Sequence, residues 1–90
     1  KKKCNASPIE LAKSYNNLAL NYRDKGEYDD AIKWMKDAEE IFKTSNTSIN
    51  ELALLYFNLG NVYKKKGDNY EAKENYEKCI KSREQSKPVK

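Results

Sequence analysis

Residues 48–67 read SINELALLYFNLGNVYKKKG, and residues 7–26 read SPIELAKSYNNLALNYRDKG. The two stretches align at an offset of 41 residues, and the matching pairs continue to Ala31 and Ala72. Apolar, polar and glycine positions match together. Matching of this kind at a fixed period indicates a duplicated supersecondary unit and not merely a biased composition.

Each stretch has the pattern of an amphipathic helix between a capping signal and a glycine. Ser7 and Ser48 each precede a glutamate by three residues, as in a capping box, and Pro8 suits the first helical position. Gly26 and Gly67 follow the last apolar residues, where glycine ends a helix in the left-handed conformation at little cost. The spacing of three and four predicts buried stripes made of Leu11, Tyr15, Leu18, Ala19 and Tyr22 in the first copy and Leu52, Leu55, Tyr56, Leu59, Val62 and Tyr63 in the second.

A second amphipathic helix follows each glycine. Its predicted apolar face comprises Tyr28, Ala31, Ile32, Met35, Ala38, Ile41 and Phe42 in the first copy and Tyr70, Ala72, Tyr76, Cys79 and Ile80 in the second. We predict helices over about residues 8–25, 28–44, 49–66 and 69–86, with a polar linker at 44–47. The expected fold is all-α, a single domain over residues 1–90. It holds two tandem helix-turn-helix repeats (about 8–44 and 49–86) with four antiparallel helices, and tails at 1–6 and 87–90.

Composition narrows the function classes. The 90 residues suffice for one small domain, and the net charge of +4 predicts only a mild attraction to anions. Histidine is absent, and Cys4 and Cys79 stand 75 positions apart, which is neither a disulfide framework nor a metal motif and suits a reducing, cytoplasmic compartment. No apolar run has the length of a membrane helix. Phosphate loops, nucleophile elbows and metal-ligand spacings are missing, so we expect neither an enzyme nor a cofactor.

The repeated residues resemble the tetratricopeptide repeat. Its pattern is met by Tyr15-x-x-Leu18-Ala19-x-x-Tyr22 followed by Ala31, and again by Tyr56-x-x-Leu59-Gly60-x-x-Tyr63 followed by Ala72. The resemblance covers residues 8–86, although the period of 41 exceeds the family's usual length of about 34. The long period and Asn-Asn-Leu-Ala at 16–19 resemble the kinesin light chain type. The resemblance implies a fragment of an α-solenoid that acts as an adaptor or scaffold and binds a protein or peptide partner.

In this family the first helix of each repeat lines a concave surface that holds the partner peptide. The positions implied here are Lys13, Asn16, Asn17, Leu20 and Arg23 in the first copy and Leu54, Phe57, Asn58, Asn61 and Lys64 in the second. Asn17 and Asn58 match one another, and the family uses such asparagines as a ladder for the peptide. A carboxamide both donates and accepts, so it suits an extended backbone. The alternative is that both only bond neighbouring helices or water.

Several positions allow two interpretations. Leu54 and Phe57 fall off the predicted apolar stripe, so they are either exposed anchors for a partner or surfaces buried against another copy. Trp34 is expected to pack rather than to recognise a partner. The run at 64–66 suits a helix end, which favours cations, so nucleic acid is not the favoured partner.

The fourth predicted helix differs from the second at four positions. Ile32, Trp34, Ile41 and Phe42 are matched by Lys73, Asn75, Ser82 and Arg83. This change predicts a polar outer face of the kind that ends an array. Because stable arrays usually hold three or more units, we also hypothesise that the chain self-associates, forming a homo-oligomer or part of a larger array.

Overall fold

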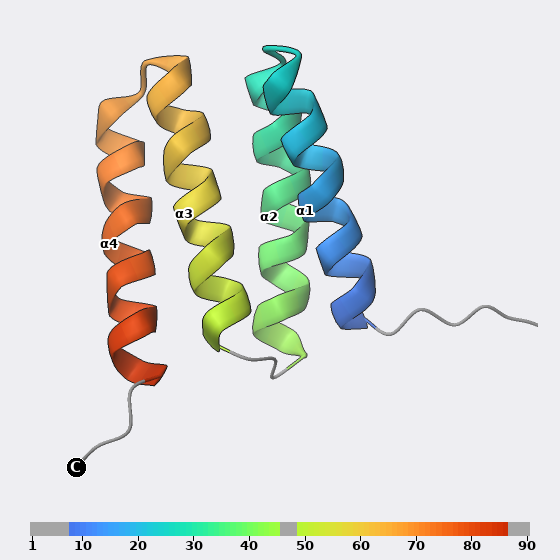
Figure 1. The fold of residues 1–90 in the computed structure, drawn as a ribbon, viewed down its shortest axis with the longest axis vertical. Coiled ribbons are helices and arrows are strands. Elements are labelled where there is room, and N and C mark those ends of the chain that lie inside the picture. Colours follow the sequence, from blue (N-terminus) through green and yellow to red (C-terminus); the bar gives the residue numbers. More distant parts are fainter. Residues whose placement is uncertain (1–7, 46–48, 87–90) are drawn as a thin grey trace, which may run out of the picture.

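A computed structural model describes residues 8–45 and 49–86, which form four helices (Figure 1). These are α1 (Pro8–Asp24), α2 (Tyr28–Thr44), α3 (Ile49–Lys66) and α4 (Asn69–Ser86). Consecutive helices pack against one another, α1 on α2, α2 on α3 and α3 on α4. The predicted all-α pair of helix-turn-helix repeats is confirmed, with the first helix ending at Asp24. The capping serines Ser7 and Ser48 and both predicted tails lie outside the described residues.

The two hairpin turns have the same geometry. Gly26 has φ +85° and Gly67 has φ +99°, both in the left-handed region that glycine adopts without a steric penalty. The N–H of Glu27 donates to the Tyr22 carbonyl at 2.9 Å, and the N–H of Asp68 donates to the Tyr63 carbonyl at 2.9 Å. These bonds satisfy carbonyls that a helix end would otherwise leave without partners. The predicted glycine caps are therefore confirmed in both copies.

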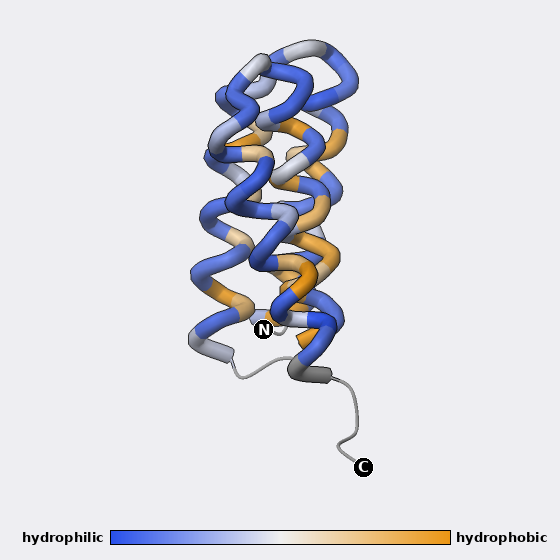
Figure 2. Tube along the Cα trace, turned by 90° about the vertical axis from the view of Figure 1, so that its left-hand side faces the viewer, coloured by the Kyte–Doolittle hydropathy of each residue, from blue (hydrophilic) through white to orange (hydrophobic). Residues whose placement is uncertain are grey.

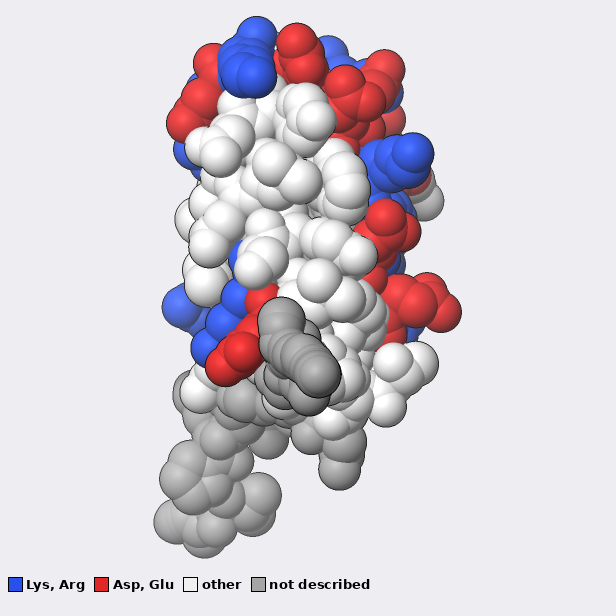
Figure 3. All heavy atoms as spheres, turned by 90° about the vertical axis from the view of Figure 1, so that its right-hand side faces the viewer, with Lys and Arg blue, Asp and Glu red and all other residues white. Residues whose placement is uncertain are grey.

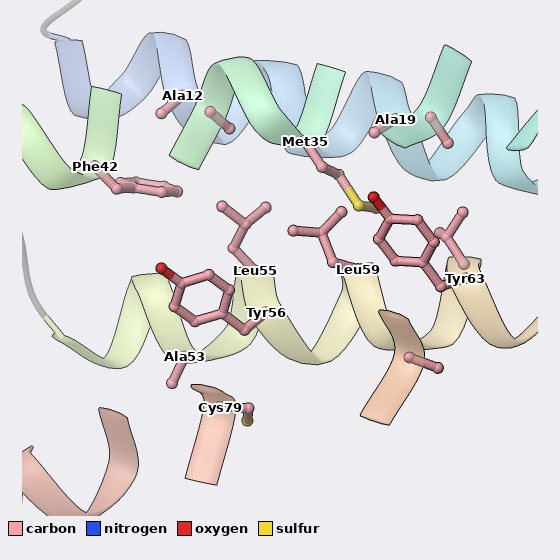
Figure 4. Packing of buried hydrophobic residues seen from close by; sticks show 14 residues of the cluster. Ala12, Ala19, Met35, Phe42, Ala53, Leu55, Tyr56, Leu59, Tyr63 and Cys79 are labelled. Carbon is pink, nitrogen blue, oxygen red and sulfur yellow. The ribbon is translucent and has the colours of Figure 1, made fainter. Parts of the chain in front are cut away.

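The core lies where α2 meets α3 and inside each hairpin. Met35 and Phe42 of α2 face Leu55 and Leu59 of α3 (Figure 4). Small residues let the helices approach closely, and the buried ones include Gly60 and the alanines Ala12, Ala19, Ala31, Ala38, Ala53 and Ala72. Cys79 is also buried, as expected for a small core residue. Seen from the α4 side, the near surface is largely hydrophilic and apolar residues gather behind it (Figure 2).

Four residues of the predicted apolar stripes are exposed. Leu11 and Leu18 of α1 are 40% and 37% exposed, and Tyr70 and Ile80 of α4 are 70% and 55% exposed. The prediction was wrong for these residues because they lie on the first and last helices. Periodicity identifies the face that suits burial, but it does not supply the helix that covers it.

Asn75 was predicted on a polar outer face, and this prediction was also wrong. Its side chain is 3% exposed, and its Nδ2 donates to the Glu71 carbonyl at 2.9 Å within α4. Trp34, the matching residue of the first repeat, is half-buried and packs in a tilted arrangement against Tyr15 of α1, with ring centroids 5.1 Å apart. Position 34 therefore faces the first helix of its own repeat, which explains why a residue at position 75 is enclosed.

Polar contacts join the two repeats. Lys66 of α3 pairs with Asp29 of α2 at 2.6 Å, and the hydroxyl of Tyr56 donates to Glu39 at 2.9 Å. The hydrogen bond to Asp29 raises the pKa of Lys66, while burial and then the bond to Glu39 raise the pKa of Tyr56. The ion pair is exposed and contributes little stability. Both contacts join α3 to α2.

Candidate functional site

A hollow of about 210 Å³ opens between α1 and α3, and we call it the amide hollow. Its lining residues are Lys13, Asn16, Asn17, Phe42, Glu51 and Leu54. The Lys13 ammonium pairs with the Glu51 carboxylate at 3.3 Å, which links the two helices at this place. Four of the residues implied by the resemblance therefore share one hollow.

The two asparagines of the amide hollow differ in their surroundings. Asn17 is exposed and Asn16 is half-buried. The Oδ1 atom of Asn16 is buried and has no hydrogen-bond partner among the described residues. A buried acceptor without a partner destabilises the folded state. Such an atom is a candidate acceptor for a ligand N–H.

A second hollow, of about 420 Å³, opens further along the same pair of helices. We call it the basic hollow, and Arg23, Asn61, Lys64 and Lys65 line it. The guanidinium of Arg23 also donates to Asp24, at 2.9 and 3.2 Å. The Oδ1 of Asn61 accepts a hydrogen bond from the hydroxyl of Tyr76 at 2.5 Å. This bond orients the amide nitrogen of Asn61. Cationic and amide donors predominate here, which suits an anionic group.

A third hollow, of about 320 Å³, lies between α3 and α4, and we call it the end hollow. Asn50, Ala53, Leu54, Phe57, Cys79 and Arg83 line it. Leu54 is 53% and Phe57 47% exposed, and the Phe57 ring packs on that of Tyr76 at 5.9 Å. Leu54 and Phe57 are exposed in the single chain, which is compatible with both interpretations of these residues, anchors for a partner or surfaces buried against another copy. Leu54 lines both this hollow and the amide hollow.

Two of the ten expected site residues lie elsewhere. Leu20 is half-buried and packs against the core, and Asn58 is half-buried and lines none of the three hollows. Asn17 therefore has a place in a hollow that its counterpart Asn58 lacks. The sequence interpretation missed Glu51, which it assigned only to a helix cap. The relevant signal was that Glu51 stands on the first helix of its repeat, three residues before Leu54.

Comparison with known families accounts for this architecture. The profile of the family described as Tetratricopeptide repeat matches residues 10–85. The chain belongs to the tetratricopeptide repeat family. This family is a non-catalytic repeat module, and its repeats generally mediate protein–protein interaction. A search of curated proteins finds no significant match.

Metal-binding groups and membrane-spanning helices were also considered for this tetratricopeptide repeat chain. The described part of the chain holds no group of three or more Cys, Asp or Glu residues placed to bind a metal ion. Among helices α1 to α4, none is both long enough and apolar enough to cross a membrane.

Proposed function

We propose that this chain is an adaptor or scaffold module that binds an extended peptide of a partner protein along α1 and α3. The observation that carries the proposal is the amide hollow, where Lys13, Asn16 and Asn17 of α1 meet Leu54 of α3. Tetratricopeptide repeats generally bind proteins, which favours this class of partner. The side chains that line the hollows determine which peptides bind.

The amide hollow suits a peptide backbone. Asn17 offers an exposed carboxamide, and Asn16 holds an acceptor oxygen without a partner. A peptide N–H that donates to that oxygen would remove the cost of leaving it unpaired. The other N–H and C=O groups of the peptide would stay available for further hydrogen bonds. This arrangement binds the main chain of a peptide and leaves sequence preference to neighbouring positions.

Sequence preference comes from the two ends of the site. Leu54 provides an exposed apolar contact at one end, and Arg23 and Lys64 provide cations at the other. Leu54 and Lys64 are ten residues apart on one helix, a rise of about 15 Å. An extended peptide covers that distance in about four or five residues. The preferred peptide therefore carries an apolar residue and an acidic residue separated by about that number of positions.

We extend the proposal to subtype and location. The period of 41 residues and the Asn-Asn-Leu-Ala stretch at 16–19 support a long-repeat tetratricopeptide module of the kinesin light chain type. Cys79 is a buried free thiol, which suits a reducing compartment, so the proposed location is the cytoplasm.

Selection of a random peptide library against the 90-residue chain tests the proposal. We expect enrichment of peptides that pair an apolar with an acidic residue at this spacing, and their synthetic versions are then measured by fluorescence anisotropy. Asn17→Ala should weaken binding several-fold, while Asn69→Ala on α4 is the matched control. Absence of any enriched motif, or binding that ignores Asn17→Ala, would contradict the proposal.

The acidic preference has its own control. Lys64→Glu should abolish selection of acidic residues, because it reverses a charge in the basic hollow. Lys81→Glu makes the same charge change on an exposed site of α4, outside the three hollows, and should leave the preference unchanged. An equal effect of both variants would show that overall charge, and not the basic hollow, attracts the peptide.

A further inference from the structure

The exposed large apolar side chains lie on the two outermost helices, α1 and α4, and on α3. Leu11 and Leu18 lie on α1, whereas the others lie on α3 and α4, namely Leu54, Phe57, Tyr70 and Ile80. Figure 3 faces the end formed by α1 and α2, and shows a broad area there without Lys, Arg, Asp or Glu, bordered by charged side chains. The α1 end therefore presents apolar surface that the other helices do not cover, and the largely hydrophilic α4 end carries the exposed side chains of Tyr70 and Ile80.

The exposed face of α1 corresponds, through the internal repeat, to a face of α3 that another helix covers. A shift of 41 residues takes Leu18 to Leu59 and Ser14 to Leu55, both of which are fully buried. Leu55 and Leu59 point from α3 toward Met35 and Phe42 of α2 (Figure 4). The exposed face of α1 is thus the counterpart of the face that α3 buries against α2.

The same shift relates the opposite end to α2. Two α2 residues make polar contacts with α3, namely Asp29, on Lys66, and Glu39, on Tyr56. Their counterparts on α4 are Tyr70 and Ile80, which are 70% and 55% exposed. The outer face of α4 is therefore the counterpart of the α2 face that receives α3. Two carboxylates of that face are replaced by an aromatic and an aliphatic side chain, and Phe42 is replaced by Arg83.

The end hollow also has a counterpart in the first repeat. Ala53, Cys79 and Arg83 correspond to Ala12, Ala38 and Phe42, which are all buried where α3 packs on the first hairpin. In the first hairpin Glu51 and Leu54 of α3 border what remains of this place, the amide hollow of about 210 Å³, whereas in the second hairpin it is a hollow of about 320 Å³. One end thus carries the exposed side chains of α1. The other end carries a hollow whose counterpart in the first repeat lies next to α3.

We propose that two copies of this chain associate head to tail, with α1 of one copy packed on α4 and the end hollow of the next. The contact repeats the α2–α3 arrangement between chains, and Leu11 and Leu18 take the places of Leu52 and Leu59. Tyr70 and Ile80 stand where Asp29 and Glu39 form polar contacts in the internal arrangement, and Arg83 stands where Phe42 packs. A contact between unlike surfaces is heterologous, so it extends to short chains or closes into rings.

Blocking each end separately tests this contact. Leu18→Glu places a charge on the α1 end, and Ile80→Glu places one on the α4 end, in both cases at an exposed position. Sedimentation of the unmodified chain should show an average mass that rises with concentration, while each variant alone remains monomeric. An equimolar mixture should form dimers and nothing larger, because each variant retains one intact end.

Other outcomes overturn the proposal. An unmodified chain that sediments as a monomer at every concentration overturns it. Self-association of Ile80→Glu as strong as that of the unmodified chain overturns it too, because it would indicate a symmetric contact between α1 ends. A mixture that stays monomeric also overturns it. Ser14→Glu and Tyr70→Asp repeat the test at neighbouring exposed positions if either first variant loses its helical circular dichroism. The test involves no peptide, so it stands or falls separately from peptide binding.

Discussion

The aromatic ring of Tyr76 lies directly against the backbone of Gly60. A Cβ atom at position 60 would meet the Cδ1 and Cε1 atoms of that ring at 2.6 Å. In the first repeat the same two positions hold Ala19 and Met35, both fully buried. Each repeat therefore joins its two helices with one small and one large residue, and only the methionine leaves room for an alanine methyl group.

Gly60→Ala should destabilise the protein although alanine favours helices. The helix gain is about 1 kcal/mol, whereas overpacking a core typically costs about 1–3 kcal/mol. The Tyr76 ring cannot simply move away, since its hydroxyl is held by Asn61 and its face by Phe57. We expect a net loss of about 1 kcal/mol in the free energy of unfolding, measured in urea.

Introducing Gly60→Ala into a Tyr76→Met background should reverse that sign. The background reproduces the methionine of the first repeat, so the added methyl group finds space and the helix gain of about 1 kcal/mol remains. A double-mutant cycle measures the coupling. If Gly60→Ala has the same effect in both backgrounds, the ring contact does not determine the choice of glycine.

Gly67→Ala isolates a different cost. No heavy atom lies within 4 Å of a Cβ built at Gly67, so the substitution meets no side chain, but φ is +99°. An L-residue in the left-handed region costs about 1–2 kcal/mol, and thermal unfolding should show that loss. Gly67→Asn should lose less, because asparagine tolerates this region better. Equal stability of the alanine variant and the unmodified chain would show that the turn changes conformation.

Local pattern was sufficient to predict the helices. The bounds of α2, α3 and α4 agree with those expected, because the signals that begin and end a helix lie within a few residues of its termini. Gly26 and Gly67 were identified as turns for the same reason: only their own backbone conformation matters. The duplicated pattern also fixed the fold class.

Burial and contacts across helices were less predictable. Leu18 and Leu59 are identical in the alignment, yet one is 37% exposed and the other fully buried, because only α3 has a helix packed on that face. Asn75 is polar and buried, since its amide bonds inside α4. The bond between Tyr56 and Glu39 joins different repeats, and no spacing within one helix encodes it. The site residues were also only partly predictable, because Asn58 matches Asn17 in sequence but lines none of the hollows between the helices.

Tyr56 should make the protein sensitive to alkaline pH. Its pKa is raised by burial and by the bond to Glu39, so the folded state keeps the phenolic proton after the unfolded chain has lost it. The unfolded chain loses it near pH 10, so this contribution to stability is complete below about pH 10 and declines as pH rises. Tyr63 and Lys66, whose pKa values are also raised, act in the same direction.

Tyr56→Phe should therefore lower stability at neutral pH by about 1 kcal/mol, through the lost hydrogen bond. It should also make the decline above about pH 10 shallower, without removing the part due to Tyr63 and Lys66. Urea unfolding at a series of pH values measures both effects. Tyr70→Phe, on a side chain that is 70% exposed, is the matched control and should preserve neutral stability. An unchanged alkaline profile in Tyr56→Phe would assign the effect to other groups.

Asn16→Leu separates a binding role of the amide hollow from a structural one. The Oδ1 of Asn16 is buried without a partner, and leaving such an atom unpaired costs about 1–3 kcal/mol. Leucine keeps a similar volume and removes that cost, so the free energy of unfolding should rise by about 1 kcal/mol. Binding of the selected peptides should weaken at the same time, because the acceptor for the peptide backbone is gone. Asn17→Leu, on an exposed side chain, should weaken binding without the gain in stability. A loss of stability in Asn16→Leu would instead show that its carboxamide supports the fold.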